Sequence, residues 1–267
     1  MFRNLQIEWM KIKNYRVFQV FSVLYLAGII LIIYIFYKTY INLIAQVQQS
    51  LTGGQNRHAS DVFQLFSAPN IWKTVCFSTS FLLYLPGMVI INLFINEVNF
   101  KTHRQNIIDG WKRETFIYTK IGLIICISLV VTIMNFIATF VMFQVTNTSF
   151  SADGIETLGL SFVQAFIYMM FALLLATLFR RSGIAIIVFF LYGLILEFLF
   201  IWLANKLIPG MGNFMPLQVA DSLVPFPRGK AWLYADLPGL EVMLPAALAF
   251  AGLYIFLAVR KYKYDDL

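Results

Sequence analysis

The richest group of ionisable side chains in this sequence lies in the segment Asn96–Lys120, NEVNFKTHRQNIIDGWKRETFIYTK. The segment combines acidic and basic residues with large apolar side chains that a docked helix would bury. Aromatic anchors surrounded by charges are typical of a surface that binds another protein. The Asp109-Gly110 pair separates a first short helix from a second helical segment that begins at Trp111. We therefore predict a docking segment for a partner protein. A solvated basic turn is the alternative interpretation.

Two further polar residues stand inside long apolar stretches, Glu197 in GLILEFLFIW and Asn135 in VTIMNFIATF. A carboxylate within a membrane indicates either a functional site or a hydrogen-bonded link that holds helices together. A buried amide commonly links two helices by a hydrogen bond. Glu197 and Asn135 are therefore candidate residues of a substrate path, and the structural interpretation stays open for both.

The common motifs of catalysis and metal binding do not occur in the sequence. It contains no GxxxxGK[ST] phosphate-binding loop, no HExxH and no GxSxG, and its histidines and cysteines lack the spacing of a metal site. Cys76 and Cys126 both lie in apolar runs and are expected to pack as small apolar side chains. We predict that the chain is not an enzyme and that it holds no metal or cofactor of its own.

The composition places these residues in a membrane protein. Of 267 residues, 60% are apolar and 12% are charged, whereas about 25% are charged in a typical soluble domain. The mean hydropathy of +0.76 supports the same conclusion. In a membrane protein, a net charge of +7 indicates basic cytoplasmic loops rather than nucleic-acid binding.

Six apolar runs each approach the roughly 20 residues that a helix needs to cross the hydrocarbon core. They cover approximately residues 17–37, 75–95, 121–143, 158–179, 183–204 and 242–259. The runs are continuous, whereas barrel strands would alternate apolar and polar residues. The predicted fold is an all-α polytopic membrane protein in which residues 1–267 form one transmembrane domain. The first run is expected to be retained rather than cleaved as a signal peptide.

The N-terminal residues 1–16 contain a candidate interfacial helix that lies flat at the membrane surface. At about 100° per residue, its apolar face carries Phe2, Leu5, Trp9 and Ile12, and its polar face carries Arg3, Asn4, Glu8 and Lys11. A simple basic flank to the first span is the alternative. At the other end of that span, Thr39–Leu51 is expected to prolong the helix beyond the membrane.

The positions of Lys and Arg predict the orientation, because these residues gather on the cytoplasmic side. If the N-terminus is cytoplasmic, most of the 20 basic residues lie inside: Arg3, Lys11, Lys13, Arg16, Lys101, Arg104, Lys112, Arg113, Lys120, Arg180, Arg181, Arg260, Lys261 and Lys263. Both termini and the 96–120 loop are thus predicted to be cytoplasmic. The 206–239 loop is predicted to be external, with Asn213–Val224 capping the helical bundle.

In its architecture the whole chain resembles the permease subunit of type-2 ABC exporters. The resemblance is carried by the N-terminal stretch IEWMKIKNYRVF, by six spans with both ends inside, and by the 96–120 loop. It implies a second permease as partner, commonly an identical copy that completes a homodimer. It also implies a separate cytoplasmic ABC ATPase subunit, in two copies, that binds ATP and Mg²⁺ and docks on the loop. The implied location is the inner membrane of a bacterium, in contact with its lipids.

The resemblance also implies roles for particular segments. Phe100–Asp109 would be the coupling helix between spans 2 and 3, Gly110–Thr115 its return toward span 3, and the external loop a re-entrant segment before span 6. Residues 1–16 would correspond to the connecting helix of the family. The docking residues would be Glu97, Phe100, Lys101, His103, Arg104, Asp109, Gly110, Trp111, Lys112 and Arg113.

The expected function is export by alternating access, powered by the ATPase subunit. Substrate would move along a dimer interface lined by spans 2 and 5, where Glu197 lies. A secondary transporter that needs no ATPase is the first alternative. A membrane scaffold without transport activity, or an intramembrane enzyme, is the second.

Overall fold

The computed structural model describes residues 8, 10–50, 64–100, 113–227 and 237–264, and these are mostly helical. Six of the helices are long and apolar enough to cross a membrane. The candidate spans are Arg16–Gln46, Asn70–Asn99, Glu114–Val145, Glu156–Phe179, Ser182–Leu207 and Leu240–Tyr264. The prediction of an all-helical chain with six candidate spans is therefore confirmed.

Four of the candidate spans are single helices. The second consists of two helices joined by a 3-10 turn, and the fifth of two helices joined by a π-helical turn. The elements are α2 (Arg16–Ser50), η1 (Gln64–Phe66), α4 (Asn70–Ser80), η2 (Phe81–Leu83), α5 (Tyr84–Asn99), α7 (Arg113–Val145), α8 (Glu156–Phe179), α9 (Ser182–Leu191), η3 (Tyr192–Leu196), α10 (Glu197–Leu207), η4 (Met211–Phe214), α11 (Gln218–Asp221) and α12 (Leu240–Tyr264). The α2 helix continues to Ser50, so the predicted extension of the first helix is observed.

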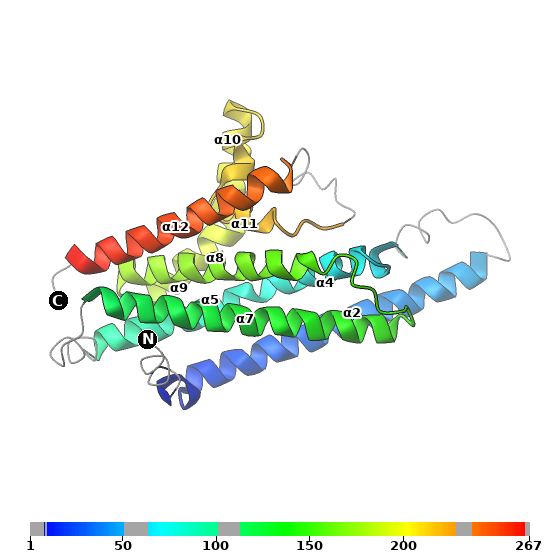
Figure 1. Ribbon diagram of the computed structural model, residues 1–267, viewed down its shortest axis with the longest axis horizontal. Coiled ribbons are helices and arrows are strands. Elements are labelled where there is room, and N and C mark those ends of the chain that lie inside the picture. The colour runs from blue at the N-terminus through cyan, green and yellow to red at the C-terminus, as the bar shows by residue number, and fades with distance from the viewer. Residues whose placement is uncertain (1–7, 9, 51–63, 101–112, 228–236, 265–267) are drawn as a thin grey trace.

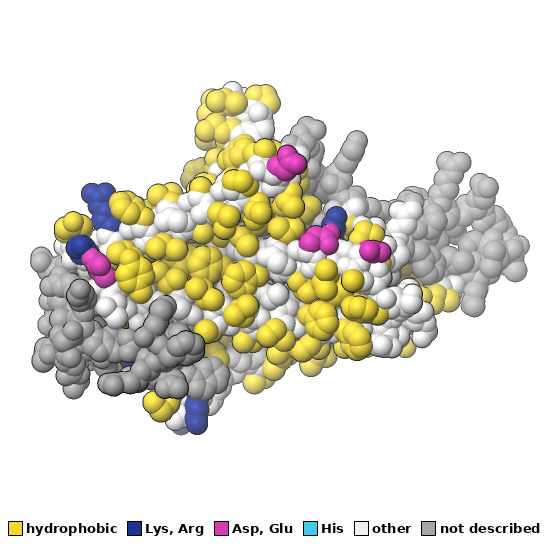
Figure 2. All heavy atoms as spheres, viewed as in Figure 1, with side chains coloured by type: hydrophobic (Ala, Val, Ile, Leu, Met, Phe, Trp, Pro, Cys, Tyr) yellow, Lys and Arg dark blue, Asp and Glu magenta, His cyan; other side chains and the backbone are white. Residues whose placement is uncertain are grey.

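The helix α8 lies at the centre of the bundle, in contact with α5, α7, α9 and α12. In contrast, α2 runs along one edge, and its Ser50 end extends beyond the neighbouring helices (Figure 1). Figure 2 shows apolar side chains over much of the visible face, with charged side chains toward its left end and in a group to the right of its centre. A helix that is apolar on most of its surface is typical of a buried position or of contact with lipid.

The second span changes its helical geometry in the middle. The 3-10 turn η2 separates α4 from α5. Pro86 follows in the first turn of α5, a position where helices tolerate proline because its N–H would have no partner within the helix. At Gly87, a Cβ atom would lie 2.5 Å from the Phe189 ring. The glycine therefore permits α9 to pack closely against this span.

The fifth span is also interrupted. A π-helical turn, η3, joins α9 to α10, and α10 projects away from the bundle in Figure 1. Such turns are frequent at functional sites, because they change the direction in which the following side chains point. The first residue after the turn is Glu197.

The described part of the 206–239 segment packs onto the bundle. Its short helix α11 contacts α8 and α12. Five apolar side chains around it are almost fully buried: Leu217, Val219, Ala220, Leu223 and Val224. These residues form the hydrophobic face by which the segment packs onto the helices, and the external position predicted for Asn213–Val224 stays a prediction.

Candidate functional site

Most of the predicted docking residues lie outside the described residues: Lys101, His103, Arg104, Asp109, Gly110, Trp111 and Lys112. The two helices that flank this segment are described. Phe100 follows the last residue of α5 and is 78% exposed, and α7 begins at Arg113. The predicted roles of these residues in docking stay predictions.

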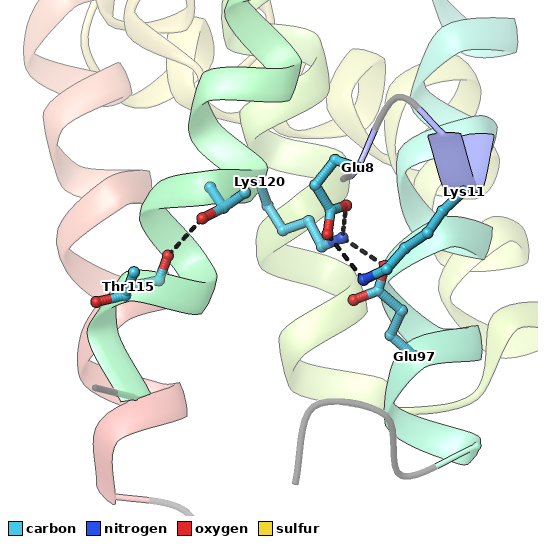
Figure 3. Close-up of polar contacts among 6 residues, drawn as sticks. Glu8, Lys11, Glu97, Thr115 and Lys120 are labelled. Carbon is cyan, nitrogen blue, oxygen red and sulfur yellow. Dashed lines mark hydrogen bonds and ion pairs between the residues drawn. The ribbon is translucent and has the colours of Figure 1, made fainter. Parts of the chain in front are cut away.

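A cluster of four charged side chains lies where these two helices meet the N-terminal residues (Figure 3). The charge cluster consists of Glu8, Lys11, Glu97 in α5 and Lys120 in α7. The Lys120 ammonium donates to Glu8 and, at 2.6 Å, to Oε1 of Glu97. Lys11 lies 3.1 Å from Glu8 and 3.8 Å from Glu97. Two acids and two bases give the charge cluster a net charge of zero.

Three of the four side chains of the charge cluster are largely buried from solvent, whereas the Lys11 side chain is 37% exposed. The side chains of Lys120 and Glu8 are each 3% exposed, and that of Glu97 is 12% exposed. The Lys120 ammonium also lies 5.2 Å from the centroid of the Phe116 ring. Removing one member of a buried ion pair leaves an uncompensated charge, which typically costs about 3–5 kcal/mol. The charge cluster therefore holds α5, α7 and the N-terminal residues in one arrangement.

The position of Glu8 corrects one sequence-based expectation. We expected Glu8 on a polar face turned to water, but the structure turns it inward to Lys120. Ile12, expected on the apolar face, is buried as predicted. The residues Glu8 and Met10–Lys13 are helical, and between them they present both a carboxylate and an apolar side chain to the bundle. The expectation failed because the partner of Glu8 is 112 positions away in the chain.

The environment of Glu8 favours its charged form. Burial alone would raise its pKa, but the charges and hydrogen bonds of Lys120 and Lys11 outweigh burial and lower the pKa below its usual value of 4.5. Glu8 is thus ionised at neutral pH and completes the charge balance with Glu97 and the two lysines.

Glu97 was predicted to contact an ATPase subunit. That role stays a prediction, and in the structure its carboxylate contacts Lys120 and Lys11 of its own chain. Nearby, the side-chain amide of Asn96 donates to the Tyr15 hydroxyl. Both residues thus attach the end of α5 to the segment that precedes α2.

A second candidate site is a cavity of about 340 Å³ between the second and fifth spans. Its walls come from α4, η2, α5, α8, η3, α10 and the 213–226 segment. Two carboxylates line it, those of Glu197 and Asp221, and we call it the acidic cavity. Asn135 is not among its lining residues.

Glu197 connects α10 to the segment that contains α11. Its Oε1 accepts backbone N–H groups from Leu217 (2.6 Å) and Gln218 (2.7 Å). The side chain is largely buried, with 4% of the residue exposed. Glu197 therefore fits the structural interpretation, because it links two elements. It also stays a candidate for the substrate path, because it lines the acidic cavity.

Asp221 lies at the last position of α11 and accepts hydrogen bonds from α8. The Tyr168 hydroxyl lies 2.8 Å from Oδ1 and 3.0 Å from Oδ2, and the Gln164 amide donates to Oδ1 at 3.0 Å. The Tyr84 ring lies next to this group, with its centroid 5.7 Å from that of the Tyr168 ring. The polar wall of the acidic cavity is therefore formed by side chains from three separate parts of the chain.

Asn135 forms a hydrogen bond between two spans. Its side-chain amide in α7 donates to the Ser161 hydroxyl in α8 at 2.7 Å, and the residue is 2% exposed. This contact matches the structural interpretation, in which an amide joins neighbouring helices.

Sequence reasoning did not identify Asp221, Gln164 or Tyr168 as site residues. A signal was present, because Gln164 and Tyr168 are four residues apart and so share one face of a helix. Asp221 is an acid within an apolar segment. It lines the same cavity as Glu197 only because that segment folds back onto the helices.

The fold defines this chain as a helical protein with six candidate transmembrane spans. Its sequence matches no protein-family model and no curated protein.

Proposed function

We propose that this chain is the membrane-spanning permease subunit of an ATP-driven exporter of the type-2 ABC class. A separate cytoplasmic ATPase subunit docks on the 96–120 loop, and its movement switches the permease between inward-open and outward-open states. Two permease chains form the complete transporter, and both termini lie on the side of the ATPase.

The observation that carries the proposal is the charge cluster. It joins the helices on both sides of the 101–112 segment, through Glu97 and Lys120, to the N-terminal helix through Glu8. A buried ion-pair group of this kind resists separation of its members. A force applied to the loop would therefore move α5, α7 and the N-terminal helix together, as coupling to an external ATPase requires.

The acidic cavity supports the transport part of the proposal. It lies between spans 2 and 5 and includes Glu197, which agrees with the substrate path inferred from the resemblance. The interruptions η2 and η3 lie in these same two spans. Helices with such breaks can change shape locally without losing the rest of their hydrogen bonds.

The test is copurification. The affinity-tagged full chain, solubilised from its native membrane in a mild detergent, is expected to bring down a subunit with ABC-type ATPase sequence motifs. Replacing Lys101, Arg104 and Trp111 together with alanine should abolish this association. The matched control replaces two lysines and one tryptophan elsewhere, Lys38, Lys206 and Trp202, all of which are exposed. The proposal would be contradicted if no ATPase copurified with the wild-type protein. It would also be contradicted if the triple variant still copurified with the ATPase.

The presence of Asp221 beside Glu197 in the cavity favours a second candidate function, an ion-coupled secondary transporter. Such transporters bind coupling ions at acidic groups within the membrane. The two functions are separated in proteoliposomes that contain only this chain. Uptake driven by a proton or sodium gradient, without ATPase or ATP, would support the second candidate and exclude the first.

A further inference from the structure

The acidic cavity is lined by acidic side chains, with no basic side chain among its described lining residues. Among the described residues that line it, two are acids, Glu197 and Asp221, and none is Lys, Arg or His. This differs from the charge cluster, in which each acid has a lysine neighbour. A bound cation favours the ionised form of both acids, and ionised carboxylates in a poorly solvated site attract a cation more strongly than they would in water.

The polar groups of the cavity offer hydrogen-bond acceptors as well as charge. Gln164 is 1% exposed, and its amide nitrogen donates to Asp221. Its Oε1 lies buried in this wall and has no hydrogen-bond partner among the described residues. A buried acceptor without a partner is unfavourable unless a ligand or water approaches it. The polar wall is thus suited to a positively charged occupant.

The remaining walls are mainly aromatic. The six aromatic lining residues are Phe77, Phe81, Tyr84, Tyr168, Phe198 and Phe226. Several form a continuous group, since the Phe77 ring lies 5.5 Å from Phe81 and 5.3 Å from Phe226. Aromatic faces attract cations and also bury apolar groups of a ligand. The described residues contain no group of three or more His, Cys, Asp or Glu side chains that could hold a metal ion.

We propose that the acidic cavity binds hydrophobic organic cations, with Glu197 and Asp221 supplying the charge and the aromatic wall holding the apolar part. A cavity of about 340 Å³ is within the size range of sites for small organic ligands. The identification of the bound cation as the transported substrate rests on the proposed function. The binding itself depends on neither an ATPase nor the direction of transport.

The test compares two probes of similar shape and opposite charge, tetraphenylphosphonium and tetraphenylborate. Each is titrated by equilibrium dialysis into the full-length chain, purified and monodisperse in nanodiscs of zwitterionic phosphatidylcholine, with empty nanodiscs as the blank. We expect saturable binding of the cation, with an affinity at least about tenfold higher than that of the anion. Equal binding of the two probes, or no saturable binding of the cation, would overturn the proposal.

Charge-removing substitutions locate the site. Glu197→Gln and Asp221→Asn keep a hydrogen-bond acceptor but remove the charge, and each is expected to weaken cation binding by about tenfold or more. The control variant carries Asp153→Asn and Glu156→Gln, which neutralise exposed acids outside the cavity lining. It should bind the cation within about twofold of wild type, since exposed charges have weak effects. Cavity variants that fold and bind as tightly as wild type would also refute the assignment.

The two proposals fail separately. If the cation binds as expected but no ATPase copurifies, the cation site stands and the ATP-driven function falls. If an ATPase copurifies but the cation and anion bind equally, the function stands and the substrate class is wrong.

Discussion

The ammonium of Lys120 contacts the carboxylate of Glu8, 112 positions earlier in the chain, and both side chains are almost fully buried. The same ammonium contacts Glu97, 23 positions earlier, at the end of α5. One lysine thus connects three segments at one end of the bundle. At that end, Lys263 in α12 also reaches Glu114 in α7, at 2.7 Å, through a more exposed ion pair.

The first prediction concerns Lys120. Lys120→Met should lower the free energy of unfolding by about 3 kcal/mol, because Glu8 and Glu97 lose the ammonium between them. Thermal unfolding of the detergent-solubilised protein measures this change. Lys38→Met, which alters an exposed lysine, should change stability by less than about 1 kcal/mol. Equal effects of the two substitutions would mean that the charge cluster does not hold the helices together.

The double variant Glu8→Gln with Lys120→Met provides a further check. Once Lys120 is gone, removing the charge of Glu8 should cost little or restore stability, since Glu8 is then a poorly compensated buried acid. If the stability loss of the double variant equalled the sum of the two single losses, Glu8 and Lys120 would not interact directly.

The second prediction concerns pH. The pKa of Glu8 is lowered in the folded protein, so its contribution to stability is complete above the pKa of the unfolded chain and disappears as pH falls through the lower folded value. The Glu8 contribution should therefore stay level from neutral pH to about pH 5 and be lost in more acidic solution. The groups facing Glu8 are Lys120, Lys11 and, through them, Glu97.

Unfolding curves recorded from pH 7 to about pH 3 measure this dependence. Glu8→Gln should have a shallower acid slope than wild type, because the substituted side chain does not titrate. An unchanged acid slope in this variant would show that other groups cause the loss of stability.

The third prediction separates the two roles of Glu197. Glu197→Ala should cost about 1–3 kcal/mol, because the buried N–H groups of Leu217 and Gln218 lose their acceptor. Glu197→Gln retains a carbonyl oxygen at that position and should cost less, while still weakening cation binding. Thermal unfolding of both variants gives the comparison. If both destabilise the protein equally, the negative charge itself is needed to hold the segment around α11.

The fourth prediction concerns the contact between the second and fifth spans. Gly87→Ala should destabilise the protein by about 1–3 kcal/mol, because the new methyl group would lie 2.5 Å from the Phe189 ring. Gly159→Ala is the matched control, since a Cβ atom there meets nothing within 4 Å. In α8 that change should be neutral or stabilise the helix by up to about 1 kcal/mol. The same unfolding measurement serves for both, and a harmless Gly87→Ala would show that the two spans can separate at no cost.

The number and type of the candidate membrane helices could be predicted from the sequence. A span is a local property, because roughly 20 consecutive apolar residues satisfy both the length of the hydrocarbon core and the hydrogen bonds of the backbone. The run at 158–179 predicted α8 almost to the residue. The helix that contains the predicted run 75–95 begins earlier, at Asn70, and Thr74 in its first turns is buried in the bundle.

Only the tertiary structure decided what the polar side chains do. The helical periodicity placed Glu8 on the face expected to contact water. In the structure Glu8 is buried, because it forms an ion pair with Lys120 of α7. Asp221 became part of the acidic cavity because the segment after the fifth span folds back onto Tyr168. The partner of a buried charge is chosen by packing between distant segments, whereas local periodicity specifies only the face of the helix that carries it.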